Sequence, residues 1–298
     1  MGERSGILLV ALAACAWGTW SIFLRYAGVE FTVATPLVFV RLGLFTGPID
    51  LRGGSPSNWD RGSKRLLFAN AVFAGGNVLT YFGAIANTSV ALAIMTHYLA
   101  PVIIALVAPW FEGERVPGAK ASAIIACVGL LLILEPWGQQ LSGSNHVLGI
   151  VLGCASAVFF AGTVLTGRHL VPRIGAAPTM AYQALIAGVM LAPLAFPGIL
   201  EVSASAWGLL ALGALIPGAA AGVLFLKGLD VIGSSRAAIL TYLEPLVGLI
   251  VGWVVFQEAL GPLVLAGAAL ILGAGYLSSV ARARAPAPDL AAEPQASG

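Results

Sequence analysis

Long apolar runs separated by short polar segments occupy almost the whole chain. Each run holds roughly 18 to 23 residues, enough for an α-helix to cross a hydrocarbon core of about 30 Å. The pattern therefore predicts about ten membrane-spanning helices. Their expected ranges are 6–27, 33–51, 66–86, 89–110, 118–135, 147–169, 178–198, 204–227, 234–256 and 261–280.

The composition supports a membrane environment. Hydrophobic residues make up 59% of the chain and charged residues 9%, whereas an ordinary soluble domain is roughly a quarter charged. The first apolar run continues past Trp17 and Trp20 to about residue 27, and further runs follow it. We therefore expect a retained first helix rather than a cleaved secretion signal.

The basic residues are distributed unevenly between the connecting segments. If the amino terminus is cytoplasmic, Arg25 lies outside and Arg41 lies within a helix, while the other basic residues fall on the inner side. The positive-inside rule favours this orientation, so we expect a multi-pass protein of the cell inner membrane with both termini in the cytoplasm. The inner basic residues are Arg4, Arg52, Arg61, Lys64, Arg65, Arg115, Lys120, Arg168, Arg173, Lys227, Arg236, Arg282 and Arg284.

An internal duplication organises the chain. The repeated motif is Tyr98-Leu99-x-Pro101 running to Glu114, and then Tyr242-Leu243-x-Pro245 running to Glu258. Each half holds five predicted helices, and an odd number of crossings makes the second half enter the membrane from the opposite side. The sequence thus predicts two inverted five-helix repeats.

The repeats predict the domain boundaries. The first repeat covers 1–135 and the second covers 147–280, with an external linker at 136–146 between them. The remaining segment, 281–298, is rich in Ala and Pro, and we expect it to be a disordered cytoplasmic tail.

Three motifs resemble one family of transporters. They are Ala16-Trp17-Gly18-Thr19, Tyr98-Leu99-Ala100-Pro101 running to Gly113-Glu114-Arg115, and Tyr242-Leu243-Glu244-Pro245 running to Gln257-Glu258. Over about residues 6–280 the chain resembles the drug/metabolite transporter superfamily, in particular its ten-helix EamA-type branch, and is most similar to the YddG-type amino-acid exporters. The resemblance implies a central cavity between the halves, alternating access and export of small metabolites.

Pro101 and Pro245 lie near the middle of the fourth and ninth predicted helices. Each lacks a backbone N–H and leaves the carbonyl four residues earlier without its usual donor. Those carbonyls belong to His97 and Thr241. Equivalent breaks in inverted repeats often border substrate sites at mid-membrane depth, although a packing kink also explains a proline within a helix.

Two ionisable side chains beside these breaks are the leading site candidates. A carboxylate such as Glu244 costs several kcal/mol in a membrane unless it is protonated, paired or hydrated. A substrate ammonium group, a coupling proton or an internal partner such as Arg41 each account for it. His97 has three interpretations, namely substrate binding, proton transfer and a hydrogen bond to a neighbouring helix.

Further polar and aromatic residues complete the expected substrate-binding set. Trp17, Tyr81, Tyr98 and Tyr242 form a predicted aromatic wall that favours flat or cationic solutes. Asn77 follows two glycines, where its amide either binds substrate or bridges two helices. Ordinary helix packing is the alternative interpretation for each of these aromatic residues.

Motifs for other chemistry are missing from the sequence. It contains no GxxxxGK[ST], HExxH or GxSxG, and we expect no enzyme activity, cofactor, metal site or nucleic-acid partner. The function predicted is a secondary transporter that exports small organic metabolites, amino acids including aromatic ones. The alternatives are a nucleotide-sugar or other organic-anion exchanger of the same superfamily, a membrane-embedded enzyme and a channel.

Overall fold

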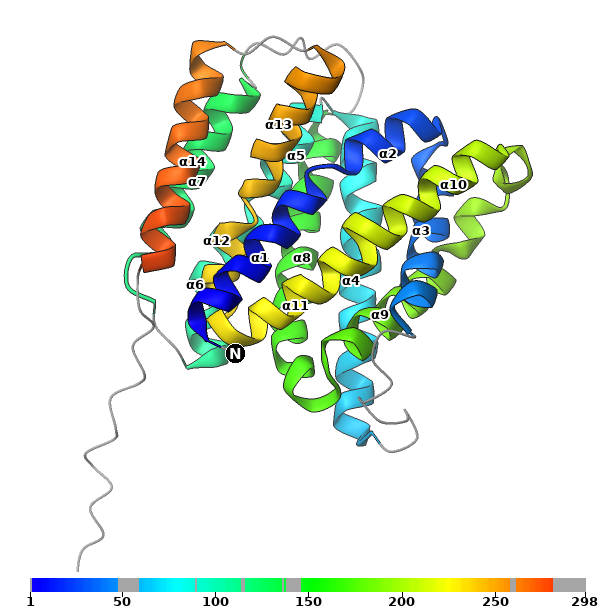
Figure 1. Cartoon of the computed structure of the whole chain (residues 1–298), viewed down its shortest axis with the longest axis horizontal. Coiled ribbons are helices and arrows are strands. Elements are labelled where there is room, and N and C mark those ends of the chain that lie inside the picture. Colours follow the sequence, from blue (N-terminus) through cyan, green and yellow to red (C-terminus); the bar gives the residue numbers. More distant parts are fainter. Residues whose placement is uncertain are drawn as a thin grey trace, which may run out of the picture.

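The computed structural model describes residues 2–47, 59–88, 90–113, 116–135, 137, 146–257 and 261–280. Every regular element within these ranges is a helix (Figure 1). Glu114 and Glu258, the ends of the repeated motif, lie outside the described residues, as do most of the expected linker and the expected tail 281–298.

The first half of the chain forms helices that follow the predicted runs. They are α1 (Glu3–Trp17), α2 (Trp20–Ala27), α3 (Phe31–Thr46), α4 (Arg61–Asn87), α5 (Val90–His97), α6 (Ala100–Glu112) and α7 (Ala119–Leu134).

The second half contains longer helices and several irregular turns. Its α-helices are α8 (His146–Ile174), α9 (Ala176–Leu191), α10 (Ala204–Gly213), α11 (Ala221–Ile232), α12 (Ser234–Leu240), α13 (Leu243–Phe256) and α14 (Pro262–Val280). Two 3-10 turns, η5 (Ala192–Ala195) and η6 (Ile199–Glu201), follow α9, and the π-helical turn η7 (Ala214–Ala220) joins α10 to α11.

Seven described helical segments are long and apolar enough to cross a membrane. They are Glu3–Ala27, Arg61–Ile85, Leu92–Glu112, His146–Ile174, Ala176–Ala195, Ala204–Ile232 and Ser234–Val255. Three shorter apolar helices, Phe31–Thr46, Ala119–Leu134 and Pro262–Leu277, occupy the other three predicted runs. The described chain is thus all-helical, with helices in each of the ten apolar regions.

Two of the interruptions occur beside the repeated prolines. The chain leaves the helix at Tyr98–Leu99, between α5 and α6, and again at Thr241–Tyr242, between α12 and α13. Pro101 and Pro245 lie in the first turn of the helix that follows each break, where the missing N–H removes no intrahelical hydrogen bond. The breaks therefore precede the prolines by two to four residues.

A third interruption divides the predicted first helix at Gly18–Thr19. A Cβ atom at Gly18 would lie 2.6 Å from the carbonyl oxygen of Glu244 and 2.6 Å from the Cβ of Val247. Glycine at this position therefore permits a backbone approach to α13 that a larger residue would block. The sequence pattern alone predicted one continuous helix here.

Helices pack in antiparallel pairs across the bundle. The neighbours α4 and α8, α1 and α11, α3 and α9, and α7 and α14 form the main contacts (Figure 1). In the last pair a Cβ at Gly129 would lie only 2.7 Å from the carbonyl oxygen of Gly267. Such close backbone approach through small residues is typical of helix packing in membranes.

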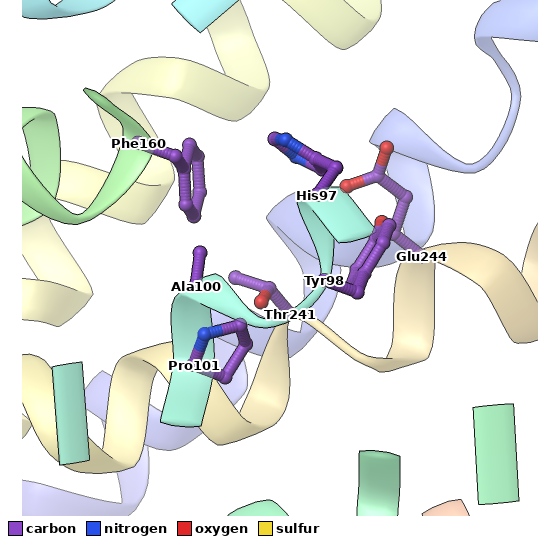
Figure 2. Close-up of a pocket in the computed structure, with 7 residues that line it drawn as sticks. All are labelled: His97, Tyr98, Ala100, Pro101, Phe160, Thr241 and Glu244. Atoms are coloured by element: carbon purple, nitrogen blue, oxygen red, sulfur yellow. The ribbon is translucent and has the colours of Figure 1, made fainter. Parts of the chain in front are cut away.

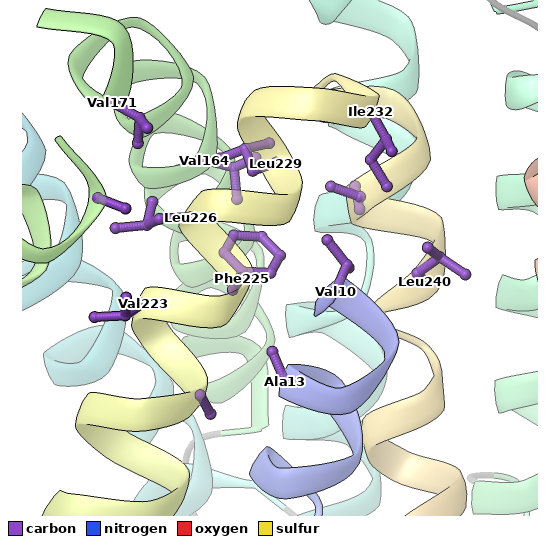
Figure 3. Packing of buried hydrophobic residues seen from close by; sticks show 14 of the residues in the cluster. Val10, Ala13, Val164, Val171, Val223, Phe225, Leu226, Leu229, Ile232 and Leu240 are labelled. Atoms are coloured by element: carbon purple, nitrogen blue, oxygen red, sulfur yellow. The ribbon is translucent and has the colours of Figure 1, made fainter. Parts of the chain in front are cut away.

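The interior is built largely from small and branched side chains. In its largest cluster Val10 and Ala13 of α1 meet Val164 of α8 and Phe225 and Leu229 of α11 (Figure 3). Large apolar side chains point outward instead, including Leu200, which is 97% exposed, and Trp110, which is 83% exposed. An apolar exterior of this kind suits contact with lipid rather than water.

Most basic residues of the described chain, with the exceptions of Arg25 and Arg41, gather at one end of the bundle. Here α1 begins, α11 ends and α12 begins, and α14 also ends on this side (Figure 1). We call it the basic end. Its basic residues are Arg4, Arg61, Lys64, Arg65, Lys120, Arg168, Arg173, Lys227 and Arg236.

Candidate functional site

A small pocket lies where the two repeated helix breaks meet. It brings together the α5–α6 break, the α12–α13 break and one face of α8 (Figure 2). Its lining residues are His97, Tyr98, Ala100, Pro101, Phe160, Thr241 and Glu244. Segments about 144 residues apart in sequence therefore contribute to one site.

The helix breaks determine which polar groups face this pocket. His97 is the last residue of α5, and Glu244 is the second residue of α13. The carbonyl of Thr241, which Pro245 deprives of its usual donor, accepts the N–H of Glu244 at 2.9 Å. Thr241 thus lacks the free carbonyl that the sequence predicted, because a tighter turn satisfies it.

His97 is held by one polar and three aromatic contacts. Its Nδ1 lies 3.0 Å from the Oγ of Ser156 on α8. Its ring centroid lies 4.6 Å from that of Tyr81, 5.3 Å from that of Tyr98 and 5.5 Å from that of Phe160. These contacts fix the imidazole at the pocket wall.

Glu244 is half-buried and lines the same pocket. Tyr98 is its hydrogen-bonding neighbour, and Tyr81 is close enough to interact with its charge. In Figure 2 His97 and Glu244 stand together at one end of the pocket, with Pro101 at the opposite end. The carboxyl group therefore faces an aromatic wall.

Arg41, one of the partners considered for Glu244, has other contacts. Its guanidinium carbon lies 4.1 Å from the ring centroid of Trp207 on α10, in cation–π geometry. Its Nη1 also donates to the carbonyl of Leu37 at 3.0 Å. These contacts are made on α3 and α10, and no described ion pair joins Arg41 to Glu244.

The expected substrate-binding residues divide into three groups. The first group, His97, Tyr98 and Glu244, lines the pocket. In the second group, which lies outside the lining, Tyr81 packs against His97 and Tyr242 packs against Tyr98. The third group is Trp17 and Asn77.

Trp17 and Asn77 are not among the lining residues. The Trp17 ring packs on Phe225, with centroids 4.9 Å apart. The side-chain oxygen of Asn77 is buried in α4 without a hydrogen-bond partner among the described residues. In this structure, therefore, neither residue belongs to the pocket.

Thr241 lines the pocket, and the sequence had singled out its carbonyl only. Three further residues at the site were not predicted from the sequence: Ala100, Phe160 and Ser156. Ala100 lies inside the Tyr-Leu-x-Pro motif, so the motif itself was a signal for it. Because α8 packs against α5 and α6, Phe160 lines the pocket and Ser156 contacts His97 from outside the lining. No local pattern within the sixth apolar run distinguishes these two positions from other helix-packing positions.

The described residues contain no group of three or more His, Cys, Asp or Glu side chains placed to hold a metal ion. The pocket itself contains one imidazole and one carboxyl group. Both groups can accept hydrogen bonds, and an ionised carboxyl group can also pair with a positive charge.

Comparison with known proteins identifies the family. The sequence profile of the EamA-like transporter family matches residues 4–135 and, separately, residues 147–280. The chain belongs to the EamA-like transporter family. It is a multi-pass membrane transporter, which confirms the resemblance to the EamA branch of the drug/metabolite transporter superfamily.

Several relatives match the EamA chain over most of its length. It is 32% identical over 277 residues to an uncharacterized transporter of Archaeoglobus fulgidus, covering 92% of this chain and 96% of that one. It is 27% identical over 281 residues to the pseudopaline exporter CntI of Pseudomonas aeruginosa, covering 90% and 94%. A solved crystal structure shares the fold with a TM-score of 0.78 at 22% identity, covering 93% of this chain and 98% of that one.

Within this EamA protein, charged side chains cross-link the helices at the basic end. Nη1 of Arg168 on α8 lies 2.7 Å from Oδ1 of Asp230 on α11, and its Nε lies 3.9 Å from Oε2 of Glu112 on α6. The backbone N–H of Ser234, which begins α12, donates to the same Glu112 oxygen at 3.1 Å. We call Glu112, Arg168 and Asp230 the ionic latch.

A second ion pair extends these contacts to the first helix. Nη1 of Arg236 on α12 lies 2.6 Å from Oε1 of Glu3 on α1, and the Arg236 side chain is 2% exposed. Together with the ionic latch, this pair ties α1, α6, α8, α11 and α12 together at one end. These ion pairs join helices of both halves of the chain at the basic end.

Proposed function

We propose that the protein is a secondary transporter that exports small amine-bearing metabolites, amino acids including aromatic ones, across the cell inner membrane. The observation that supports this most is Glu244, which is the only carboxyl-bearing side chain among the seven described residues that line the pocket. A carboxylate beside aromatic rings favours an ammonium group through ion pairing and cation–π attraction. The name of the relative CntI, an exporter, supports the outward direction.

We propose that transport proceeds by alternating access between two inverted five-helix repeats, 1–135 and 147–280. The family profile matches each half once. Two helices, α3 and α7, pack antiparallel against their own repeat equivalents, α9 and α14 (Figure 1). A two-fold axis in the membrane plane produces such an arrangement. The pairing of α4 with α8 likewise has a counterpart in the pairing of α11 with α1.

The same proposal places the basic end in the cytoplasm. Basic residues gather there, and the positive-inside rule assigns such an end to the inner side. Both the start of α1 and the end of α14 lie on this side (Figure 1), in keeping with cytoplasmic termini. The ionic latch would then close the cytoplasmic entrance.

Proton coupling follows from the chemistry of the pocket. A single carboxylate neutralises either an ammonium group or a proton, so the two bind to Glu244 in competition. Release of substrate outside lets Glu244 take up a proton, and release of that proton inside restores the carboxylate for the next substrate. His97 lies at the same wall and is the second group able to accept a proton.

The alternative of an organic-anion exchanger receives less support. Recognition of phosphate or carboxylate groups favours Arg or Lys, and no such residue is among the seven lining positions described. Arg41, the deep basic residue of the described helices, contacts Trp207 instead. An enzyme or a channel is disfavoured because the family and the named relatives are transporters.

Transport by purified protein in liposomes tests the proposal. Labelled amino acids and simple amines are loaded with and without an imposed pH gradient, and Glu244→Gln and His97→Ala are compared with the wild-type protein. We expect Glu244→Gln to abolish both amine transport and its dependence on the pH gradient. The matched control is Glu201→Gln, which neutralises an exposed carboxylate at the 3-10 turn η6.

Two results would contradict the proposed function. One is undiminished amine transport by folded Glu244→Gln and His97→Ala proteins. The other is a wild-type protein that transports organic anions and ignores every amine in the panel.

A further inference from the structure

We propose that Ser156 fixes the tautomer of His97, so that His97 Nε2 and the Glu244 carboxylate form a paired acceptor site selective for primary ammonium groups over fully alkylated ones. This inference rests on the proposed function and deepens it, because it names the substrate group that the pocket recognises. It assigns a positioning role to a serine that does not line the pocket.

The first step of the argument is to identify the group to which the Ser156 hydroxyl donates its proton. Ser156 is completely buried, and its Oγ donates to the carbonyl of Gly153 at 2.7 Å. A hydroxyl has one proton to donate and two lone pairs that accept. Because the Gly153 carbonyl takes that proton, Ser156 faces His97 as an acceptor.

The second step is the protonation of the imidazole. His97 Nδ1 lies 3.0 Å from Ser156 Oγ, so the hydrogen bond between them requires a proton on Nδ1. In a neutral imidazole one ring nitrogen donates and the other accepts. Neutral His97 therefore presents Nε2 as a bare acceptor.

The third step is the environment of Nε2. No described residue donates a hydrogen bond to Nε2. Nε2 is also absent from the described side-chain atoms that are fully buried and lack a hydrogen-bond partner. The ring lines the same pocket as Glu244. The aromatic rings of Tyr81, Tyr98 and Phe160 surround the imidazole, and they provide no competing cation.

Two acceptors at one pocket determine the chemistry of the ligand. A primary ammonium has three N–H donors and satisfies the Glu244 carboxylate and His97 Nε2 together. A trimethylammonium group keeps the charge but has no N–H, so it would leave Nε2 unpaired within the pocket, at a cost. Charge alone would not discriminate between these two groups, whereas the paired acceptors do.

The tautomer is measured directly by NMR of the full-length protein in nanodiscs. Selective ¹⁵N labelling of histidine reports which ring nitrogen bears the proton, and the variants His146→Gln and His169→Gln assign the other two histidines. We expect His97 to be protonated at Nδ1 and bare at Nε2, and we expect Ser156→Ala to change this pattern. Wild-type protein with a proton on Nε2 would overturn the inference.

Selectivity is measured as the ratio of affinities for a primary amine and its N-trimethyl analogue in proteoliposome competition. Ser156→Ala is expected to weaken binding of the primary amine about five- to tenfold and to leave binding of the trimethyl analogue unchanged. The matched control is Thr163→Ala on the same helix, whose hydroxyl donates only within α8, to the carbonyl of Phe159 at 3.0 Å. The control is expected to keep the wild-type ratio.

The outcomes separate this inference from the proposed function. If the wild-type protein transports amines but prefers the trimethyl analogue, or if Ser156→Ala keeps the wild-type ratio, the paired acceptor site is wrong and amine transport stands. If the wild-type protein binds no amine, both ideas fail. His97→Ala serves as a second variant, and it should lose the selectivity even where Ser156→Ala folds poorly.

Discussion

The hydroxyl of Tyr242 donates a hydrogen bond to the backbone carbonyl of Tyr98 at 2.7 Å. These residues occupy the same position in the two copies of the repeated motif, and their rings lie 5.6 Å apart. The bond links the α12–α13 break to the α5–α6 break directly behind the pocket. It therefore ties the two halves of the chain together at the point where both helices are interrupted.

Removal of this hydroxyl is expected to destabilise the protein. Tyr242 is 1% exposed, so Tyr242→Phe leaves a buried carbonyl without its donor, at a cost of about 1–3 kcal/mol. Thermal unfolding in detergent measures the loss as a lower melting temperature. The control is Tyr182→Phe, because Tyr182 makes an edge contact with the Trp59 ring and no described hydrogen bond through its hydroxyl. Equal melting temperatures for the two variants would contradict the role of Tyr242.

Gly18 is expected to tolerate no side chain. A Cβ at this position would lie 2.6 Å from the Glu244 carbonyl oxygen, so Gly18→Ala must displace α13 and the Glu244 side chain with it. We predict a loss of stability of about 1–3 kcal/mol, as for overpacking, and reduced amine transport. Gly208→Ala in α10 is the matched control, because nothing lies within 4 Å of its added methyl group, and it should be neutral or slightly stabilising.

Weakening the ionic latch is expected to open the basic end. Arg168→Ala removes the shared partner of Asp230 and Glu112, leaving two carboxylates that repel one another. A reporter cysteine in place of buried Ala108, one turn before Glu112, should then react faster with a polar thiol reagent. Lys227→Ala removes an exposed basic side chain on α11 and is the control. Unchanged labelling by Arg168→Ala would show that other contacts close this end.

Asp60 gives the structure a pH-dependent helix cap. It precedes α4 and accepts hydrogen bonds from the Ser63 Oγ at 2.6 Å and the Ser63 N–H at 2.9 Å. These bonds favour the charged carboxylate and lower the pKa of Asp60 below its ordinary value. The stabilisation is therefore fully present above the ordinary carboxyl pKa and is lost as the pH falls through the lower folded-state value.

The corresponding variant is Asp60→Ala. It should lower the melting temperature slightly at neutral pH, and the difference from wild type should shrink in acid as the wild-type carboxylate becomes protonated. A scan of melting temperature against pH measures the effect. A difference that stays constant down to strongly acidic pH would contradict an electrostatic contribution from the cap.

Much of the architecture was accessible from the sequence because it depends on composition and periodicity. Apolar runs of membrane-spanning length predicted an all-helical membrane protein, and the helices occupy those runs. Motifs such as Tyr98-Leu99-Ala100-Pro101 identified the EamA branch, which the family profile confirms. The amino-acid substrate and the inverted arrangement of the repeats stay proposals.

Contacts between residues distant in the sequence determined which side chains are partners across helices. Ser156 and His97 are 59 positions apart, and nothing local marks that serine as a partner of that histidine. Trp17 packs on Phe225 of α11, and Arg41 makes a cation–π contact with Trp207 of α10. Both partners lie on neighbouring helices. Side-chain partners across helices depend on the rotation and depth of each helix, and hydropathy specifies neither.

The sequence by itself determined that the chain is a helical membrane transporter, and it located His97, Tyr98 and Glu244 beside the repeated prolines, because burial in lipid constrains the length and polarity of every helix. Only the tertiary structure decided which of the candidate residues share a pocket. That selection depends on how α5, α8 and α13 meet, and their meeting is governed by close contacts such as that of Gly18 with the Glu244 carbonyl. Such contacts form between residues that are distant in the chain, so no local pattern encodes them.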